Sequence, residues 1–266
     1  MKEFRLLEHN DADGITNMAI DESLFINYKK YRIPTLRIYG WNPLAISVGR
    51  FQKIEGLFKN DMTNYTIVRR ITGGGAIIHH NEITYSIVCS TQDLGIDKVE
   101  VKKGFKILTD FLIRTYKNFH LNANYAISEY SEKLGIKSKL CFAAKEEYDI
   151  VIDRKKIGGN AQKRGKDIIF QHGSIPIKID FELFYKIFNE SFTPNKNSIT
   201  FLLNHITEKD IINFKELLKY NFEKSLNIRL IKEQLTKEEN YTKNILIKEK
   251  YSNKEWNLYG KETRMA

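Results

Sequence analysis

The sequence VRRITGGGAIIHHNEITYS, residues 68–86, joins one strand pattern, three successive glycines and further strand patterns without a break. Residues 65–70 alternate like a β-strand and run directly into the glycines. Residues 76–80 and 82–90 carry two more strand patterns, and we expect them to pair as a β-hairpin. This stretch therefore predicts sheet structure on both sides of a glycine turn.

The glycine turn follows two adjacent arginines, Arg69 and Arg70. Gly73, Gly74 and Gly75 let the backbone come close to a ligand, with free amides facing it. Arginine side chains beside such a turn suit a phosphate or a carboxylate group. The alternative is that the triplet only makes a tight turn. It is not a P-loop, because no GKS or GKT follows.

Helix and strand patterns alternate along the rest of the chain. Apolar residues at helical spacing predict helices in residues 15–31, 98–118, 180–192 and 207–226. Alternating patterns predict strands in residues 35–39, 44–49 and 245–249, and a three-stranded meander in residues 148–153, 156–162 and 167–177. We expect one α+β domain over residues 1–266, with mainly antiparallel or mixed sheets flanked by helices and a helical subregion at about 180–245.

The composition is that of an ordinary globular chain, 42% hydrophobic and 29% charged. The sequence contains no run of about 18 apolar residues, so we expect no membrane span. The first residues lack the basic start and apolar core of a signal peptide, so we expect a cytoplasmic location. Two cysteines exclude a disulfide framework, and no motif predicts a metal site.

The net charge of +10, from 43 Lys and Arg against 33 Asp and Glu, has three interpretations. It suits nucleic-acid binding, docking to acidic protein partners, or no more than solvated lysines. The lysines are scattered rather than striped, and no nucleic-acid motif occurs, so we expect no nucleic-acid partner.

The two cysteines lie in different settings. Cys89 is inside an apolar strand pattern, where a cysteine usually acts as a small buried hydrophobe. Cys141 lies at an element boundary, where a substrate can reach a thiol. A nucleophilic thiol needs a lowered pKa, and Lys156 is a candidate cation if its strand returns along residues 148–153. The alternative for Lys156 is a surface lysine in a basic turn.

Several blocks, taken together and in order, resemble the biotin/lipoate protein ligase and octanoyltransferase superfamily. The resemblance covers most of residues 1–180 and the closing KYSNKEWNLYG. It rests on the blocks GITNMAIDESLF, WNPLAISVGRFQ, VRRITGGGAIIHHNEITYS and KKIGGNAQKRGKDIIFQHGSIPI. It implies the α+β catalytic-domain fold of that superfamily.

The cysteine position distinguishes the activities that the superfamily implies. Cys141 precedes Lys156 by fifteen residues, which resembles the octanoyltransferase type with its cysteine upstream of the KxxG block. The resemblance then implies catalytic roles for Cys141 and Lys156, octanoyl-acyl carrier protein as donor, and no cofactor. The implied acceptor is the lysine of a lipoyl domain, such as the glycine cleavage H protein or the E2 component of a 2-oxoacid dehydrogenase.

The resemblance also implies which residues bind the substrate. They are Arg69, Arg70, Gly73, Gly74, Gly75, His79, Gly158 and Gly159. Gly75 departs from the octanoyltransferase type, which often has arginine there, and gives a GGG turn similar to that of the ligases. Two alternatives therefore stay open, an ATP- and magnesium-dependent lipoate–protein ligase and an amidotransferase between carrier proteins.

Overall fold

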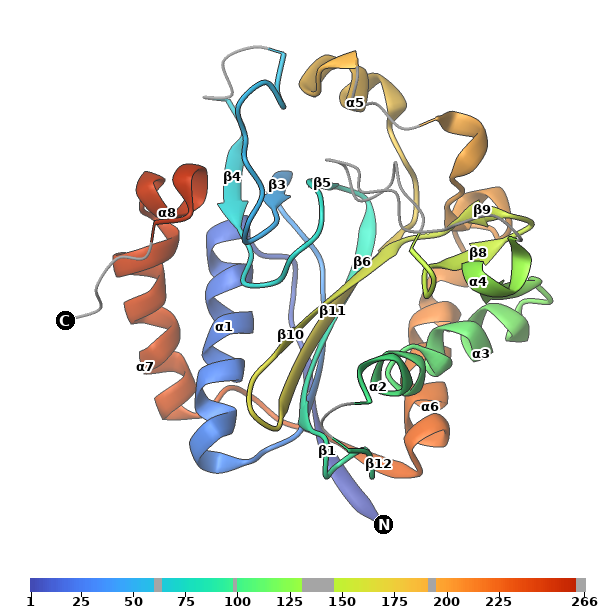
Figure 1. The fold of residues 1–266 in the computed structure, drawn as a ribbon. Helices are drawn as coiled ribbons and strands as arrows, with labels where there is room; N and C mark the ends of the chain where they lie inside the picture. Colours follow the sequence, from blue (N-terminus) through green and yellow to red (C-terminus); the bar gives the residue numbers. More distant parts are fainter. Residues whose placement is uncertain (60–63, 98–99, 131–145, 191–194, 262–266) are drawn as a thin grey trace.

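A six-stranded mixed sheet forms the centre of the protein (Figure 1). The computed structural model describes residues 1–59, 64–97, 100–130, 146–190 and 195–261. The strand order is β10-β11-β6-β2-β1-β12. Their bounds are Gly159–Arg164, Ile168–Pro176, Glu82–Ser90, Thr35–Tyr39, Lys2–Glu8 and Ile228–Lys232. β1 runs parallel to both β2 and β12, and the remaining pairs are antiparallel.

Helices cover both faces of this sheet. Figure 1 shows α1 (Gly14–Tyr31) beside α7 (Lys237–Leu246) on one face, and α3 (Asp110–Asn118) beside α6 (Asp210–Leu226) on the other. Strand alternation on β6 supplies both cores, because neighbouring side chains point to opposite faces. Tyr85, Ile87 and Cys89 pack in the core of α3 and α6, whereas Val88 packs in the core of α1.

Two small sheets flank the central one. The first has the order β4-β3-β5, with bounds Thr66–Arg69, Ala45–Val48 and Ile77–His79. The second has the order β7-β8-β9, with bounds Ala123–Tyr125, Ile150–Ile152 and Lys155–Lys156. The predicted hairpin of residues 76–80 with 82–90 is therefore wrong, since β5 pairs with β3 while β6 pairs with β2 and β11.

The predicted strand over residues 156–162 is also wrong, because the chain changes sheets within it. Lys156 ends β9 in a small sheet, and Gly159 begins β10 in the central sheet. Between them, Gly158 has a φ of +85°, and a Cβ atom there would lie 2.3 Å from the carbonyl oxygen of Ser174. A positive φ and so close a neighbour together require glycine. Gly158 is thus the point at which the meander divides.

The helices depart from the predictions in two places. The helix expected over residues 98–118 is divided into α2 (Val101–Ile107) and α3. Residues 245–249, predicted as a strand, are helical, because α7 begins with a Thr236–Glu239 capping box and continues into a π-helical turn over Ile247–Tyr251. Leu246 and Tyr251 are fully buried along this helical segment.

The other helical elements are short. They are α4 (Ala126–Glu129), α5 (Phe181–Ile187), α8 (Lys254–Tyr259) and the 3₁₀ turns Lys196–Ser198 and Leu202–Asn204. Strand β12 lies within the predicted helical subregion of about 180–245 and was not predicted. Within the described ranges, no helix is long and apolar enough to cross a membrane.

We expect Gly158→Ala to lower the free energy of unfolding by roughly 3 kcal/mol, because it combines backbone strain with a carbonyl clash. Gly95→Ala is the control, since Gly95 has a φ of +63° but nothing within 4 Å of an added Cβ. That variant should lose only about 1 kcal/mol in urea denaturation. Equal losses would show that the contact with Ser174 is unimportant.

We expect His9 to reduce stability as the pH falls from about 6.5 to about 4. Burial and then the neighbouring Arg37 charge lower the pKa of His9 from 6.5 to about 4 in the fold. Between these values the unfolded chain binds a proton that the folded chain excludes, so stability is fully present above 6.5 and falls below it. His9→Gln should flatten that part of the stability–pH curve; an unchanged slope would contradict the prediction.

Candidate active site

A cavity with about 420 Å³ of empty space, open on one side to solvent, lies where the central sheet meets the β4-β3-β5 sheet. Its walls come from α1, β3, β5, β6, β10, β11 and the glycine turn. Of the residues predicted to bind substrate, Arg70, Gly74, His79 and Gly159 line it. The structure therefore brings together residues separated by almost ninety positions in the sequence.

Arg70 holds the glycine turn from the inside. Its guanidinium donates to the carbonyl oxygens of Gly73 and Gly75 at 2.8 and 2.7 Å. It also donates to the carbonyl oxygen and the hydroxyl of Ser47 at 3.2 and 3.1 Å. Gly74 has a φ of +94°, which glycine adopts without strain. Within the described residues, no protein group accepts a hydrogen bond from the amides of Gly73 and Gly74.

Arg69 serves a different purpose from its neighbour. Its guanidinium donates to the carbonyl oxygens of Gly49 at 2.7 Å, Trp256 at 3.0 Å and Leu258 at 2.8 Å. The Trp256 indole donates back to the carbonyl oxygen of Arg69 at 2.9 Å. These contacts attach α8 to the end of β4, and Arg69 is not among the residues that line the cavity. Its role in the structure is to anchor the C-terminal helix.

His79 is fixed on three sides. Its Nδ1 lies 2.8 Å from Glu82 Oε1, and its Nε2 lies 2.7 Å from Ser47 Oγ. The Trp41 ring stacks on it with 3.8 Å between centroids and 10° between planes. Burial would raise the pKa of Glu82, but the His79 ring and the Ser174 and Thr84 hydroxyls outweigh burial and lower it. Glu82 is therefore a carboxylate at neutral pH.

His172 makes a second chain of contacts from the opposite wall. Its Nε2 lies 2.6 Å from the hydroxyl of Thr72, at the start of the glycine turn. Its Nδ1 lies 3.7 Å from Asp21, which forms a buried ion pair with Arg37 at 2.7 Å. Burial lowers the pKa of His172, although Asp21 opposes the shift, so the ring is neutral at neutral pH. The start of the turn is thus bound directly to His172 through Thr72. The end of the turn is bound to His79 through Arg70 and Ser47.

These partners were not predicted from the sequence. Trp41, Ser47, Glu82 and His172 all lie inside the blocks that carry the family resemblance, but their types and spacing gave no sign of a network. One signal was available, because Asp21 occurs within an otherwise apolar helix face. A carboxylate buried on such a face needs a polar partner.

Lys156 is buried, with only 1% of its surface exposed, so the surface-turn alternative is wrong. Its Nζ lies 2.6 Å from Asp149 Oδ2, and β9 pairs with β8 as the strand prediction required. Gly159, three positions further on, lines the cavity. Lys156 itself is not among the residues that line the cavity, and its buried Nζ has the Asp149 carboxylate beside it.

The two cysteines can be compared only in part. Cys141, the predicted nucleophile, lies outside the described residues. Cys89 is fully buried in the core of α3 and α6, and burial raises the pKa of its thiol well above the usual range. The expectation that Cys89 is a buried hydrophobe is confirmed.

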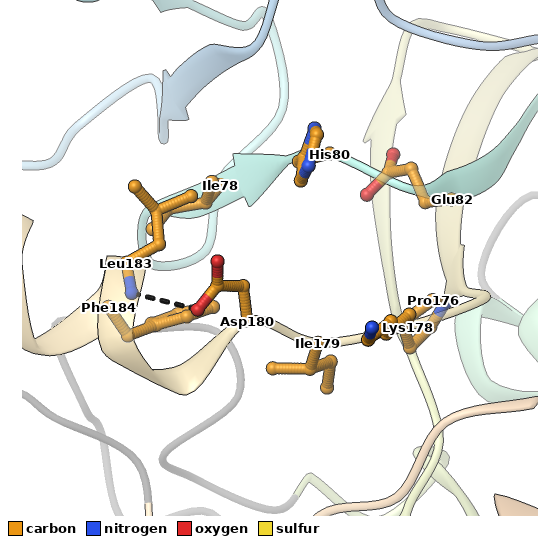
Figure 2. A pocket seen from close by; sticks show the side chains of 9 residues that line it. All are labelled: Ile78, His80, Glu82, Pro176, Lys178, Ile179, Asp180, Leu183 and Phe184. Carbon is orange, nitrogen blue, oxygen red and sulfur yellow. Dashed lines mark hydrogen bonds between the residues drawn. The ribbon is translucent and has the colours of Figure 1, made fainter. Parts of the chain in front are cut away.

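A second cavity, with about 330 Å³ of empty space, lies between the β5–β6 turn and the segment after β11 (Figure 2). Ile78 and His80 line it, whereas Ile77 and His79 line the first cavity, as strand alternation requires. Glu82 lines this second cavity while its carboxylate binds His79. Glu82 therefore lines one cavity and holds a side chain that lines the other.

Residues 13–238 match the family described as the lipoyl protein ligase A/B catalytic domain. The chain belongs to this family. Among curated relatives, octanoyltransferase LipM of Bacillus anthracis is 35% identical over 260 residues, covering 91% of this chain and 92% of the relative. Octanoyltransferase LipM of Clostridioides difficile is 34% identical, covering 97% and 99%.

Solved structures of this family share the fold. Ta0514 of T. acidophilum, a lipoate protein ligase homologue with bound lipoic acid, superposes with a TM-score of 0.81 at 22% identity, covering 97% of this chain and 99% of that one. A lipoate-protein ligase A bound with ATP gives 0.79 at 22% identity, covering 96% and 98%. The expected α+β catalytic-domain fold is confirmed.

The division of work between the arginines predicts two different effects. Arg69→Lys should release α8, because three lysine donors cannot reach the same carbonyl groups as the planar guanidinium. Amide exchange over Lys254–Tyr259 should then accelerate about tenfold for each 1.4 kcal/mol lost. Arg70→Lys should leave α8 protected and accelerate exchange of the Arg50 amide, which donates to the carbonyl oxygen of Thr72 at the start of the turn at 2.8 Å. Hydrogen-exchange mass spectrometry distinguishes the two, and identical exchange patterns would contradict this assignment.

Proposed function

We propose that this protein is an octanoyltransferase that moves an octanoyl group from acyl carrier protein to a lysine of a lipoyl domain. The carrying observation is the match, over more than nine-tenths of the chain, to relatives of that name at 34–35% identity. The proposed acceptors are the glycine cleavage H protein and the E2 component of 2-oxoacid dehydrogenases, and the proposed location is the cytoplasm.

In this proposal Cys141 carries the acyl group. Its thiolate attacks the thioester carbonyl of the donor, the carrier thiol leaves with a proton, and an acyl-enzyme forms. The acceptor lysine, as a neutral amine, then attacks the new thioester and displaces the Cys141 thiolate, giving an amide, and the proton that the amine loses passes to Lys156, which gave one to the carrier thiol. Both steps proceed without ATP or a metal, because thioester exchange is nearly level in free energy and amide formation is downhill.

The proposed role of Lys156 is to stabilise the Cys141 thiolate and to transfer protons to and from the leaving thiols. The support is that Lys156 is buried beside Asp149, where an ammonium acts more strongly than in water. Cys89 is unsuitable as an alternative nucleophile, since its thiol is sealed in the core and its pKa is raised.

The chemistry of the first cavity supports an uncharged acyl ligand. Met18, Trp41 and Ile77 supply apolar wall, and Arg70 is engaged by carbonyl groups. A free carboxylate or a phosphate would require a cation turned toward it. We assign the amides of Gly73 and Gly74 to the oxyanion that forms when the thioester is attacked.

The net charge of +10 fits partners that are acidic proteins. Opposite fields accelerate the encounter of an enzyme with a charged carrier domain. In this proposal the same basic surface attracts both the donor and the acceptor protein. We propose no nucleic-acid partner.

A second candidate is an ATP-dependent lipoate–protein ligase. Gly75 favours it, because the GGG turn is similar to that of ligases in the sequence resemblance. Such an enzyme would use ATP and magnesium to activate a free acid, and would not need Cys141. An amidotransferase would instead take its acyl group from another lipoyl domain, again through Cys141.

The decisive experiment is an intact-mass measurement after incubation with octanoyl-acyl carrier protein and no nucleotide. We expect the wild type to gain the mass of one octanoyl group and to transfer it to a lipoyl domain. Cys141→Ala should abolish both, whereas Cys89→Ala should retain both. Transfer by Cys141→Ala at the wild-type rate, or product only with ATP and free acid, would refute the proposal.

A further inference from the structure

Glu82 is the point at which three side chains of the first cavity converge, those of His79, Thr84 and Ser174. Oε1 accepts hydrogen bonds from His79 and from the Thr84 hydroxyl, and Oε2 accepts one from Ser174 at 2.6 Å. The Trp41 indole donates to Thr84 at 2.8 Å and stacks on His79. One carboxylate therefore fixes His79 directly and fixes the ring stacked on it through Thr84.

These contacts determine where the proton of His79 lies. Glu82 is ionised and can only accept, so Nδ1 of His79 carries the hydrogen. The other ring nitrogen, Nε2, lies 2.7 Å from the Ser47 hydroxyl, which is able to donate to it or to accept from it. Arg70 donates to the same Ser47 oxygen at 3.1 Å.

The chain of contacts continues into the glycine turn. Arg70 holds Ser47 with one guanidinium nitrogen and the carbonyl groups of Gly73 and Gly75 with another. Glu82, His79, Ser47 and Arg70 are all at least nine-tenths buried in their side chains. Because water cannot replace a hydrogen bond between these buried side chains, a shift of one side chain displaces the next.

We propose that Glu82 is a positioning residue for acyl transfer, which orients His79 and, through Ser47 and Arg70, keeps the Gly73–Gly75 turn in the conformation that stabilises the oxyanion. The inference rests on the proposed function. Glu82 is not among the residues that line the first cavity; it lines the second, and Figure 2 shows its side chain there.

The proposal is tested with two substitutions at Glu82. Glu82→Gln keeps an oxygen that can accept from His79 and Thr84, while its amide donates to Ser174. Glu82→Leu removes every acceptor. We expect the single-turnover rate of acylation by octanoyl-acyl carrier protein to fall on the order of 100-fold in Glu82→Leu, and less than about fivefold in Glu82→Gln. The KM for the donor should change less than about twofold in both.

A spectroscopic measurement separates positioning from a general loss of structure. Nitrogen-15 spectra of the imidazole should show a hydrogen held on Nδ1 of His79 in the wild type and in Glu82→Gln. Glu82→Leu should give a mixture of tautomers. Ser47→Ala breaks the next link with little change of volume, so it should slow acylation like Glu82→Leu while keeping the hydrogen on Nδ1. It also provides the test if Glu82→Leu does not fold.

The matched control is Glu239→Leu, which removes an equally buried carboxylate that binds Arg5 at 2.5 Å, outside the cavity. It should lower the melting temperature and leave acylation unchanged. Full activity of folded Glu82→Leu, or equal losses in Glu82→Gln and Glu82→Leu, would overturn the inference. If the wild type forms no acyl-enzyme, the proposed function fails instead, and the same variants still test Glu82 in the ATP-dependent reaction.

Discussion

The buried guanidinium of Arg70 is the interaction on which the site depends. Only 2% of the residue is exposed, and a cation so deeply buried is stable only if its donors are satisfied. The turn satisfies them by directing the carbonyl groups of Gly73 and Gly75 inward, with Gly74 at positive φ between them. Gly74 is therefore the glycine that the cation requires, because an added Cβ would lie 2.8 Å from the Arg70 guanidinium.

Local patterns predicted the elements well, and their partners poorly. The helix over residues 15–31 and the strands beside the glycine turn follow from periodicity within the segment itself. The choice of partner depends on distant residues. β5 joins the small sheet because Ile77 and Ile78 pack in one core with Ile46 and Val48, whereas β6 belongs to the central sheet. Nothing within residues 76–90 distinguishes this arrangement from a hairpin.

The site shows the same division. Arg70, Gly74, His79 and Gly159 were predicted from motif and resemblance, and all line the cavity. The carboxylates that bind these residues were not predicted, since the role of each depends on a partner in another element. Glu82 meets Ser174 across 92 positions, and the sequence contains no short-range sign of that contact. A carboxylate next to apolar residues has the pattern of a solvent-facing position until the opposing strand is known.

Charge matching explains how a strongly basic chain can enclose an uncharged ligand. In the described part of the protein, three buried cations have partners: Arg70, which lines the cavity, has carbonyl groups, Arg37 has Asp21 and Lys156 has Asp149. A free acid entering this cavity would have to displace one of these partners, whereas a thioester brings no charge to be matched. The proposed function requires a cation only while the thiolate exists, and Lys156, whose Nζ lies 2.6 Å from Asp149 Oδ2, is the cation proposed for it. The arrangement favours a transient negative charge over a permanent one, which is the electrostatic difference between transferring an acyl group and activating a free acid.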